Sequence, residues 1–206
     1  MRQLIIFLFL AGSFLAQKRL SFTEFRLGTL SPKDSEAGFY GTISSGQMLD
    51  ANLAYNLELG YFGKRRSNTT SYKDSINQVT SVTTTYTESL TMIPVLAKFN
   101  FVKDIGNLLF KADIGVGYAF LWESSEDFET SETDSRHFNG FIWQFGADAG
   151  IQLSETGSVF AGLFYNGGTL TGNARKLFGR LPTVDEKNMS GLGFRLTIRV
   201  DGLGLL

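Results

Sequence analysis

The sequence predicts an all-β protein whose eight antiparallel strands close into an up-and-down transmembrane β-barrel. Eight segments alternate between apolar and polar residues with a period of two, and the connections between them alternate between short and long. Many of the segments are also longer than the roughly five or six residues of a typical strand in a soluble protein. Strands of about 9–11 residues are needed to cross a bilayer at a tilt, so these lengths favour a membrane barrel.

The composition agrees with long strands joined by tight turns. The chain of 206 residues contains 23 Gly, 19 Phe and only 3 Pro, and glycine with aromatic residues favours strands over a helical bundle. The formal net charge is −1, which gives no support for a nucleic-acid partner held by bulk electrostatics, and we expect none. There is no cysteine, so an exported chain must be stabilised by hydrogen bonds and packing.

Residues 1–16 are predicted to be a secretory signal peptide. Arg2 precedes the apolar stretch Leu4–Leu10, and small residues follow it, which is typical of such a signal. The cleavage site is expected between positions 13 and 17, after Ser13 or after Ala16; the alternative is a retained N-terminal helix. No later run of 18 apolar residues exists, so we expect no transmembrane helix.

Residues 17–206 are expected to form a single barrel domain. Its predicted strands, in chain order, are Phe22–Leu30, Gly38–Met48, Leu53–Gly63, Thr87–Phe101, Leu108–Trp122, Phe138–Leu153, Ser158–Leu170 and Ser190–Val200.

Each predicted strand divides into two faces. In the fifth strand, one face carries Ala112, Ile114, Val116, Tyr118, Phe120 and Trp122, and the other carries Lys111, Asp113, Gly115 and Gly117. The third, fourth, sixth and eighth strands show the same division between a continuous apolar face and a row of glycine, amide and charged residues. Such a division indicates that the apolar face meets lipid and the polar face lines the barrel.

The connections predict which end of the barrel faces which compartment. Three are tight and rich in Asp, Asn, Ser or Gly, namely "QMLDAN", "VKDIGN" and "SETG". The others are polar and mostly longer, namely "SPKDSEA", "KRRSNTTSYKDSINQVTSVTTTY", "ESSEDFETSETDSRH" and "TGNARKLFGRLPTVDEKN". Short periplasmic turns and long extracellular loops are the pattern of an outer-membrane barrel. A soluble periplasmic sandwich is the alternative fold.

Aromatic belts at the two membrane interfaces are predicted from the direction of the strands. With a periplasmic N-terminus the fifth strand runs outward, which places Trp122 at the outer interface. The fourth strand runs inward, which places Phe99 and Phe101 at the periplasmic interface. Trp143 on the sixth strand is assigned to the same belts.

The segments "MIPVLAKFNF", "KADIGVGYAFLWE" and "SVFAGLFYNGG", with this strand order and loop pattern, resemble the small outer-membrane β-barrel superfamily of OmpA-like and OmpX-like eight-stranded barrels. The resemblance covers nearly all of the mature chain and is architectural. It implies location in the outer membrane of a Gram-negative bacterium, contact with membrane lipid, insertion by the barrel-assembly machinery and a monomeric state.

Nine charged residues are predicted to face the barrel interior, four acids and five bases: Glu24, Arg26, Glu58, Lys98, Lys111, Asp113, Asp148, Arg195 and Arg199. Side chains just fill the interior of an eight-stranded barrel, and buried charges must be paired. A closed salt-bridge network is therefore the favoured interpretation. The alternative is a narrow pore or a small-molecule pocket, because the interior glycines could either make room for long side chains or leave a water-filled lumen.

No catalytic, metal or cofactor site is predicted, and we do not expect an enzyme. The one histidine, His137, lies near Ser135 in the sequence, which leaves an outer-membrane lipid-modifying enzyme as a third alternative. The third long connection is acidic but lacks the spacing of a calcium loop. Basic residues such as Lys64 and Arg66 could bind lipopolysaccharide phosphates or pair with that acidic connection. We therefore expect a barrel of structural or surface-interaction type.

Overall fold

The structure is a computed structural model, and it describes residues 21–73, 80–127, 132–172 and 185–204. The predicted signal peptide lies outside the described residues. Among the described residues, no helix is long and apolar enough to cross a membrane.

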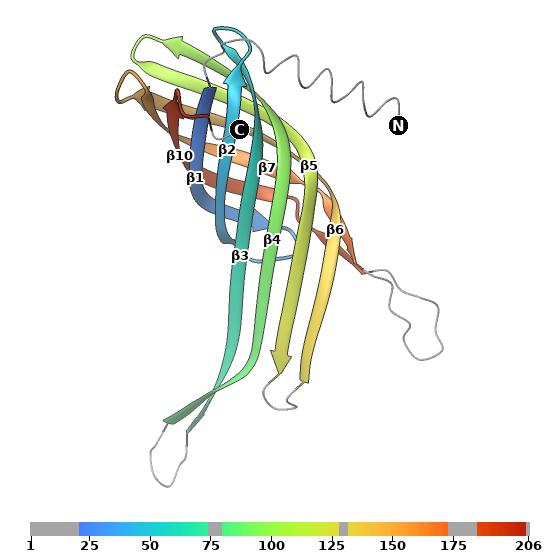
Figure 1. The fold of residues 1–206 in the computed structure, drawn as a ribbon. Helices are drawn as coiled ribbons and strands as arrows, with labels where there is room; N and C mark the ends of the chain where they lie inside the picture. The colour runs from blue at the N-terminus through green and yellow to red at the C-terminus, as the bar shows by residue number, and fades with distance from the viewer. Residues whose placement is uncertain (1–20, 74–79, 128–131, 173–184, 205–206) are drawn as a thin grey trace, which may run out of the picture.

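The described chain is a closed antiparallel β-barrel (Figure 1). The strands are β1 (Ser21–Pro32), β2 (Gly38–Met48), β3 (Leu53–Lys73), β4 (Thr80–Ile105), β5 (Leu108–Asp127), β6 (Glu132–Gln152), β7 (Gly157–Gly167), β8 (Thr169–Gly172), β9 (Glu186–Asn188) and β10 (Gly191–Asp201). Each strand from β1 to β7 pairs with its neighbour in sequence, β7 pairs with β10, and the pairing of β10 with β1 closes the cylinder.

The ten segments occupy eight positions around the barrel. β6 pairs with β7 along one part of its length and with β8 nearer the long hairpins, so β8 continues the barrel position of β7. In the same way β9, which pairs with β8, continues the position of β10, which pairs with β7. The break between β7 and β8 falls at Gly168, whose φ of 155° is rarely adopted by other residues. The predicted eight-stranded up-and-down barrel is therefore confirmed, although the seventh and eighth predicted strands are each interrupted.

Short turns join the strands at one end of the barrel. Ile105 and Leu108 are directly paired across Gly106 and Asn107, and Gly106 has a φ of 69°. A hairpin with so short a loop requires a residue that tolerates positive φ, which explains the glycine. At the β2–β3 turn, the Asp50 side chain accepts hydrogen bonds from the backbone N–H groups of Asn52 and Leu53, at 2.8 and 2.7 Å.

Two of the predicted loops are wrong in part, because the strands continue far into them. β3 extends to Lys73 and pairs with β4 from Thr80, with an irregularity at Asn68, and β5 and β6 pair as far as Asp127 and Glu132. Figure 1 shows both hairpins projecting at the end opposite the short turns. The Thr and Ser residues in these segments do not give the strands an apolar face, which is why the sequence pattern predicted loops. Backbone pairing between the strands continues although that face is missing.

The outer surface of the barrel is apolar. Large side chains on the outward face are about half exposed, at 44–60%: Phe25, Leu27, Leu57, Leu59, Ile114, Val116, Phe141, Phe145, Leu196 and Ile198. A soluble protein would hide such side chains, so this face is suited to lipid.

The inner surface has two layers. The layer nearer the short turns contains the charged side chains, whereas the layer nearer the long hairpins is apolar. The expectation that the interior row is only glycine, amide and charge is thus incomplete.

Candidate functional site: the barrel interior

All nine predicted interior charges point inward and are buried, with at most 6% of any of these residues exposed. Strand parity explains their common orientation, because Glu24 and Arg26 on β1, and Lys111 and Asp113 on β5, are spaced by two residues. The remaining five come from β3, β4, β6 and β10, so the network ties together six strands of the barrel.

Eight of the nine charges form a closed ring in which acids and bases alternate. In order around the ring the residues are Glu24, Arg26, Glu58, Lys98, Asp113, Arg195, Asp148 and Lys111, and Lys111 returns to Glu24. Each residue contacts two groups of opposite charge, so the ring of four acids and four bases has no net charge. We call this set the charged ring.

The arginines make the strongest contacts in the charged ring. Arg195 donates from Nε and Nη2 to the two oxygens of Asp148, both at 2.9 Å, and its Nη2 also contacts Asp113. Arg26 contacts both Glu24 and Glu58. Guanidinium groups suit this role because their planar N–H donors match carboxylate oxygens in pairs.

The lysines join the arginine-centred halves of the charged ring. Lys98 Nζ lies 2.8 Å from Glu58 Oε1 and 3.5 Å from Asp113 Oδ1. Lys111 Nζ lies 3.3 Å from Glu24 and 3.2 Å from Asp148. Lys111 and Asp113, which are two residues apart in the sequence, therefore belong to one ring but pair with different partners.

The interior glycines make room for the long charged side chains. A Cβ atom added at Gly146 would lie 2.3 Å from Arg195 Nη2, and one added at Gly115 would lie 2.5 Å from Lys98 Cγ. Both distances are too short for any side chain. At these two positions, the glycines therefore accommodate the charged ring.

A buried apolar layer lies inside the barrel, between the charged ring and the end that carries the long hairpins. Its members are at most 4% exposed: Leu30, Tyr40, Phe62, Leu90, Met92, Leu96, Ala119, Leu121, Phe138, Ile142, Phe164, Leu170 and Met189. The sequence does contain a signal for this layer, because Leu96 and Met92 share the strand face of Lys98, and Leu121 shares that of Asp113. Gln144 connects the two layers by donating to Tyr40 Oη at 2.9 Å and accepting from Lys98 Nζ at 2.6 Å.

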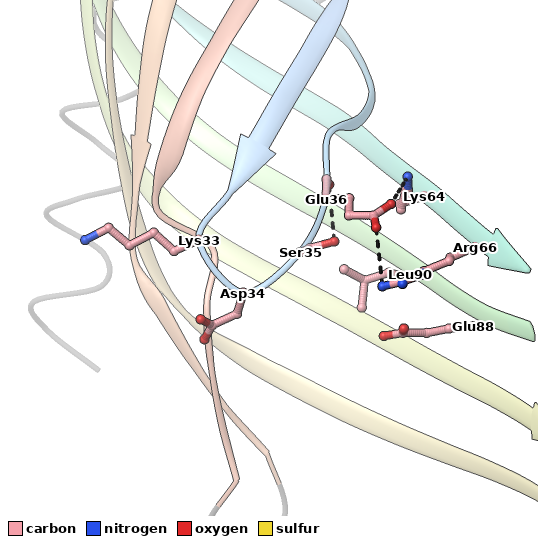
Figure 2. Close-up of a pocket in the computed structure, with 8 residues that line it drawn as sticks. All are labelled: Lys33, Asp34, Ser35, Glu36, Lys64, Arg66, Glu88 and Leu90. Carbon is pink, nitrogen blue, oxygen red and sulfur yellow. Dashed lines mark hydrogen bonds and ion pairs between the residues drawn. The ribbon is translucent and has the colours of Figure 1, made fainter. Parts of the chain in front are cut away.

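A vestibule opens beyond the apolar layer, between the β1–β2 connection and the β3–β4 hairpin (Figure 2). Its cavity has a volume of about 340 Å³, and Leu90 belongs to its lining. Glu36 lies 2.8 Å from Lys64 Nζ and 3.3 Å from Arg66 Nη1. The hydrogen bond and charge of Lys64, with the charge of Arg66, hold the pKa of Glu36 below its usual value.

The predicted belt residues are all on the outer surface. Trp122 is 38% exposed, Trp143 40%, Phe99 57% and Phe101 47%. Trp143 stacks on Phe145, with ring centroids 5.9 Å apart. Trp122 lies next to the outer hairpin, whereas Trp143 pairs with Val116 in the middle of its neighbouring strand. Their assignment to membrane interfaces stays a prediction.

His137 and Ser135 are exposed on the outer surface of β6, away from the charged ring. The His137 ring packs edge-on against Trp122, with centroids 6.4 Å apart. In the described part of the chain, no three His, Cys, Asp or Glu residues are grouped so that they could hold a metal ion.

Comparison with known proteins agrees with this architecture. A family model described as the outer membrane protein beta-barrel domain matches residues 12–176. The fold is similar to a major outer membrane protein from Thermus thermophilus, with 14% identity, a TM-score of 0.61, and coverage of 90% of this chain and 100% of that chain. It is also similar to OprG from Pseudomonas aeruginosa (12% identity, TM-score 0.53, coverage 90% and 97%) and to Neisserial surface protein A (13%, 0.50, 88% and 95%). No curated protein matches the chain.

Proposed function

The chain belongs to the family of the outer membrane protein beta-barrel domain, as the resemblance in its sequence predicted, and we propose that it is a closed barrel of structural or surface-interaction type. Its location is the outer membrane of a Gram-negative bacterium. In this role the barrel anchors the two extended hairpins and holds them above the membrane surface.

The two-layered interior supports a closed barrel. The charged ring, which has no net charge, crosses the half of the lumen nearer the short turns. The apolar layer fills the half nearer the long hairpins. An ion that entered from outside would have to lose its hydration in the apolar layer, which is costly. It would then have to displace a ring residue that already has two partners of opposite charge.

The extended hairpins support a surface role. β3 and β4 continue for many residues beyond the part of β3 that pairs with β2, which ends at Gly63. The hairpin of β5 and β6 also extends beyond its apolar band, which on β5 ends at Trp122. Connecting segments that rise above a rigid scaffold are common sites of recognition. Lys64 and Arg66 at the base of the β3–β4 hairpin would meet anionic groups such as lipopolysaccharide phosphates.

Single-barrel recording in planar lipid bilayers tests the closed interior. The purified barrel is expected to show no discrete channel openings above the noise of the protein-free bilayer. Reproducible openings of the unmodified protein would refute the closed barrel and favour the narrow pore. A variant with Arg195→Ala, Leu121→Ala and Phe138→Ala provides the positive control, because it removes side chains from both layers that close the lumen.

The enzymatic alternative is tested with the same preparation. Lipid deacylation would be measured with the unmodified protein and with His137→Ala, whose substituted side chain lies on the outer surface. We expect both proteins to be inactive. Activity that depends on His137 would replace the structural role by a catalytic one.

A further inference from the structure

Arg199 is the one predicted interior charge that does not belong to the charged ring. It lies on β10 toward the short-turn end of the barrel, paired in register with Glu24 and Ser158. That end faces the periplasm in barrels with short turns and long outer loops. Arg199 is a buried cation at the periplasmic mouth, and its ion-pair partners are Asp201 at 2.8 Å and, more distantly, Glu24 at 3.9 Å.

The contacts of Arg199 leave much of its hydrogen-bonding capacity unused. Nε donates to Asp201 Oδ1 at 2.8 Å, and Nη2 donates to the thioether of Met48 at 3.2 Å, which is a weak acceptor. Nη1 is buried without a hydrogen-bond partner among the described residues, and it lies 3.9 Å from Glu24 Oε1. The guanidinium also stacks on the ring of Phe22, 4.1 Å from its centroid, which fixes its position.

A cavity of about 210 Å³ opens beside this guanidinium at the periplasmic mouth. Part of its lining is apolar and comes from Met48, Leu109 and Phe160. Two carboxylates, Asp104 and Asp201, also line it. The cavity therefore combines one incompletely satisfied cation with an apolar wall and two acids.

These features select the chemistry of a ligand. A guanidinium binds a carboxylate or a phosphate through paired N–H donors, but Asp104 and Asp201 would repel a doubly charged phosphate more strongly than a singly charged carboxylate. The apolar wall favours a short hydrocarbon stem, and the volume lies below the roughly 300–1,000 Å³ of pockets that hold drug-sized ligands. We propose that the periplasmic mouth binds a small monocarboxylate with a short apolar stem, whose carboxylate takes the place of the Met48 thioether on Arg199.

Binding is tested on the whole folded barrel in detergent micelles with butyrate as the probe. Butyrate is expected to raise the unfolding temperature in a saturable manner, because a ligand that binds only the folded state stabilises it. Butyramide, which has the same shape without the charge, and inorganic phosphate are expected to have much smaller effects. Equal stabilisation by butyrate and butyramide would overturn the proposal.

Two variants locate the site. Arg199→Gln is expected to abolish the butyrate effect, whereas Lys103→Gln, which changes an exposed base on β4 outside the cavity, is expected to retain it. Asp201→Asn removes the competing carboxylate and is expected to tighten butyrate binding about fivefold. Tighter binding cannot result from damaged folding, so this variant decides the outcome even if Arg199→Gln fails to fold. Unchanged or weaker butyrate binding by Asp201→Asn would overturn the proposal.

The source of the carboxylate is identified by a second probe. N-acetylalanine carries the carboxylate of a peptide end, whereas butyrate represents a free short-chain acid. Saturable binding of either probe that depends on Arg199 supports the site, and the tighter probe identifies the source. Absence of binding by both would refute it. The site does not depend on the barrel being closed, so channel recordings leave this test unaffected.

Discussion

Replacing Lys111 by methionine removes one cation from the charged ring while keeping a long side chain in its place. Lys111 Nζ contacts Glu24 at 3.3 Å and Asp148 at 3.2 Å, and it lies 4.8 Å from the centroid of the Phe160 ring. The variant leaves Asp148 with Arg195, leaves Glu24 with Arg26 and the more distant Arg199, and gives the ring a net negative charge.

The expected cost follows from these contacts. Removing one partner of a buried ion pair typically costs about 3–5 kcal/mol. Both carboxylates keep an arginine, Arg26 or Arg195, so we expect the lower end of this range. For a domain of this size, about 3 kcal/mol corresponds to a fall of about 6–12 °C in the unfolding temperature.

The assay is thermal unfolding of the purified barrel in detergent, followed by circular dichroism and by the mobility of the folded form on gels. Lys103→Met is the matched control, because Lys103 is exposed on the outside of β4, and it should change stability by no more than about 0.5 kcal/mol. The double variant Lys111→Met with Glu24→Gln restores the charge balance and should lose less stability than the sum of the two single variants. If Lys111→Met unfolds at the temperature of the unmodified protein, the ring is hydrated rather than sealed, and the pore alternative gains support.

Three further outcomes are expected. The double variant Leu121→Ala with Phe138→Ala should lower the free energy of unfolding by about 2–5 kcal/mol per site in thermal unfolding. It should still show no channel openings in bilayers, because the charged ring remains, and openings would show that the ring conducts ions. Gly146→Ala, whose Cβ would lie 2.3 Å from a ring guanidinium nitrogen, should cost about 1–3 kcal/mol in the same assay, and a neutral effect would contradict the close packing of the ring. In the vestibule, the depressed pKa of Glu36 means that its contact with Lys64 persists at neutral pH and is lost as the pH falls through that lowered value. Carboxyl NMR should show Glu36 titrating at a higher pH in Lys64→Gln, and an unchanged titration would exclude Lys64 as the cause.

The barrel fold and the orientation of its side chains could be predicted from local sequence patterns. A period of two is a local property of a strand, so it already separates Lys111 and Asp113 from Ile114 and Val116, and it assigns the first pair to the interior and the second to lipid. Alternation of short and long connections likewise predicted the up-and-down order of the strands. These features depend on a few neighbouring residues, and they can be predicted without knowledge of the rest of the chain.

The pairing of the interior groups, in contrast, could be found only in the folded barrel. Lys111 pairs with Glu24, 87 residues away, because the register of the strands and the closure of β1 on β10 bring them together. The same closure excludes Arg199 from the ring and leaves it at the periplasmic mouth. It also brings inward apolar residues such as Phe62 and Leu121 to the same height in the barrel, so that they form one layer. Strand parity assigns each of them to the interior but does not show that they meet. Strand parity specifies the face of a residue, whereas its partners across the lumen depend on how the whole barrel closes.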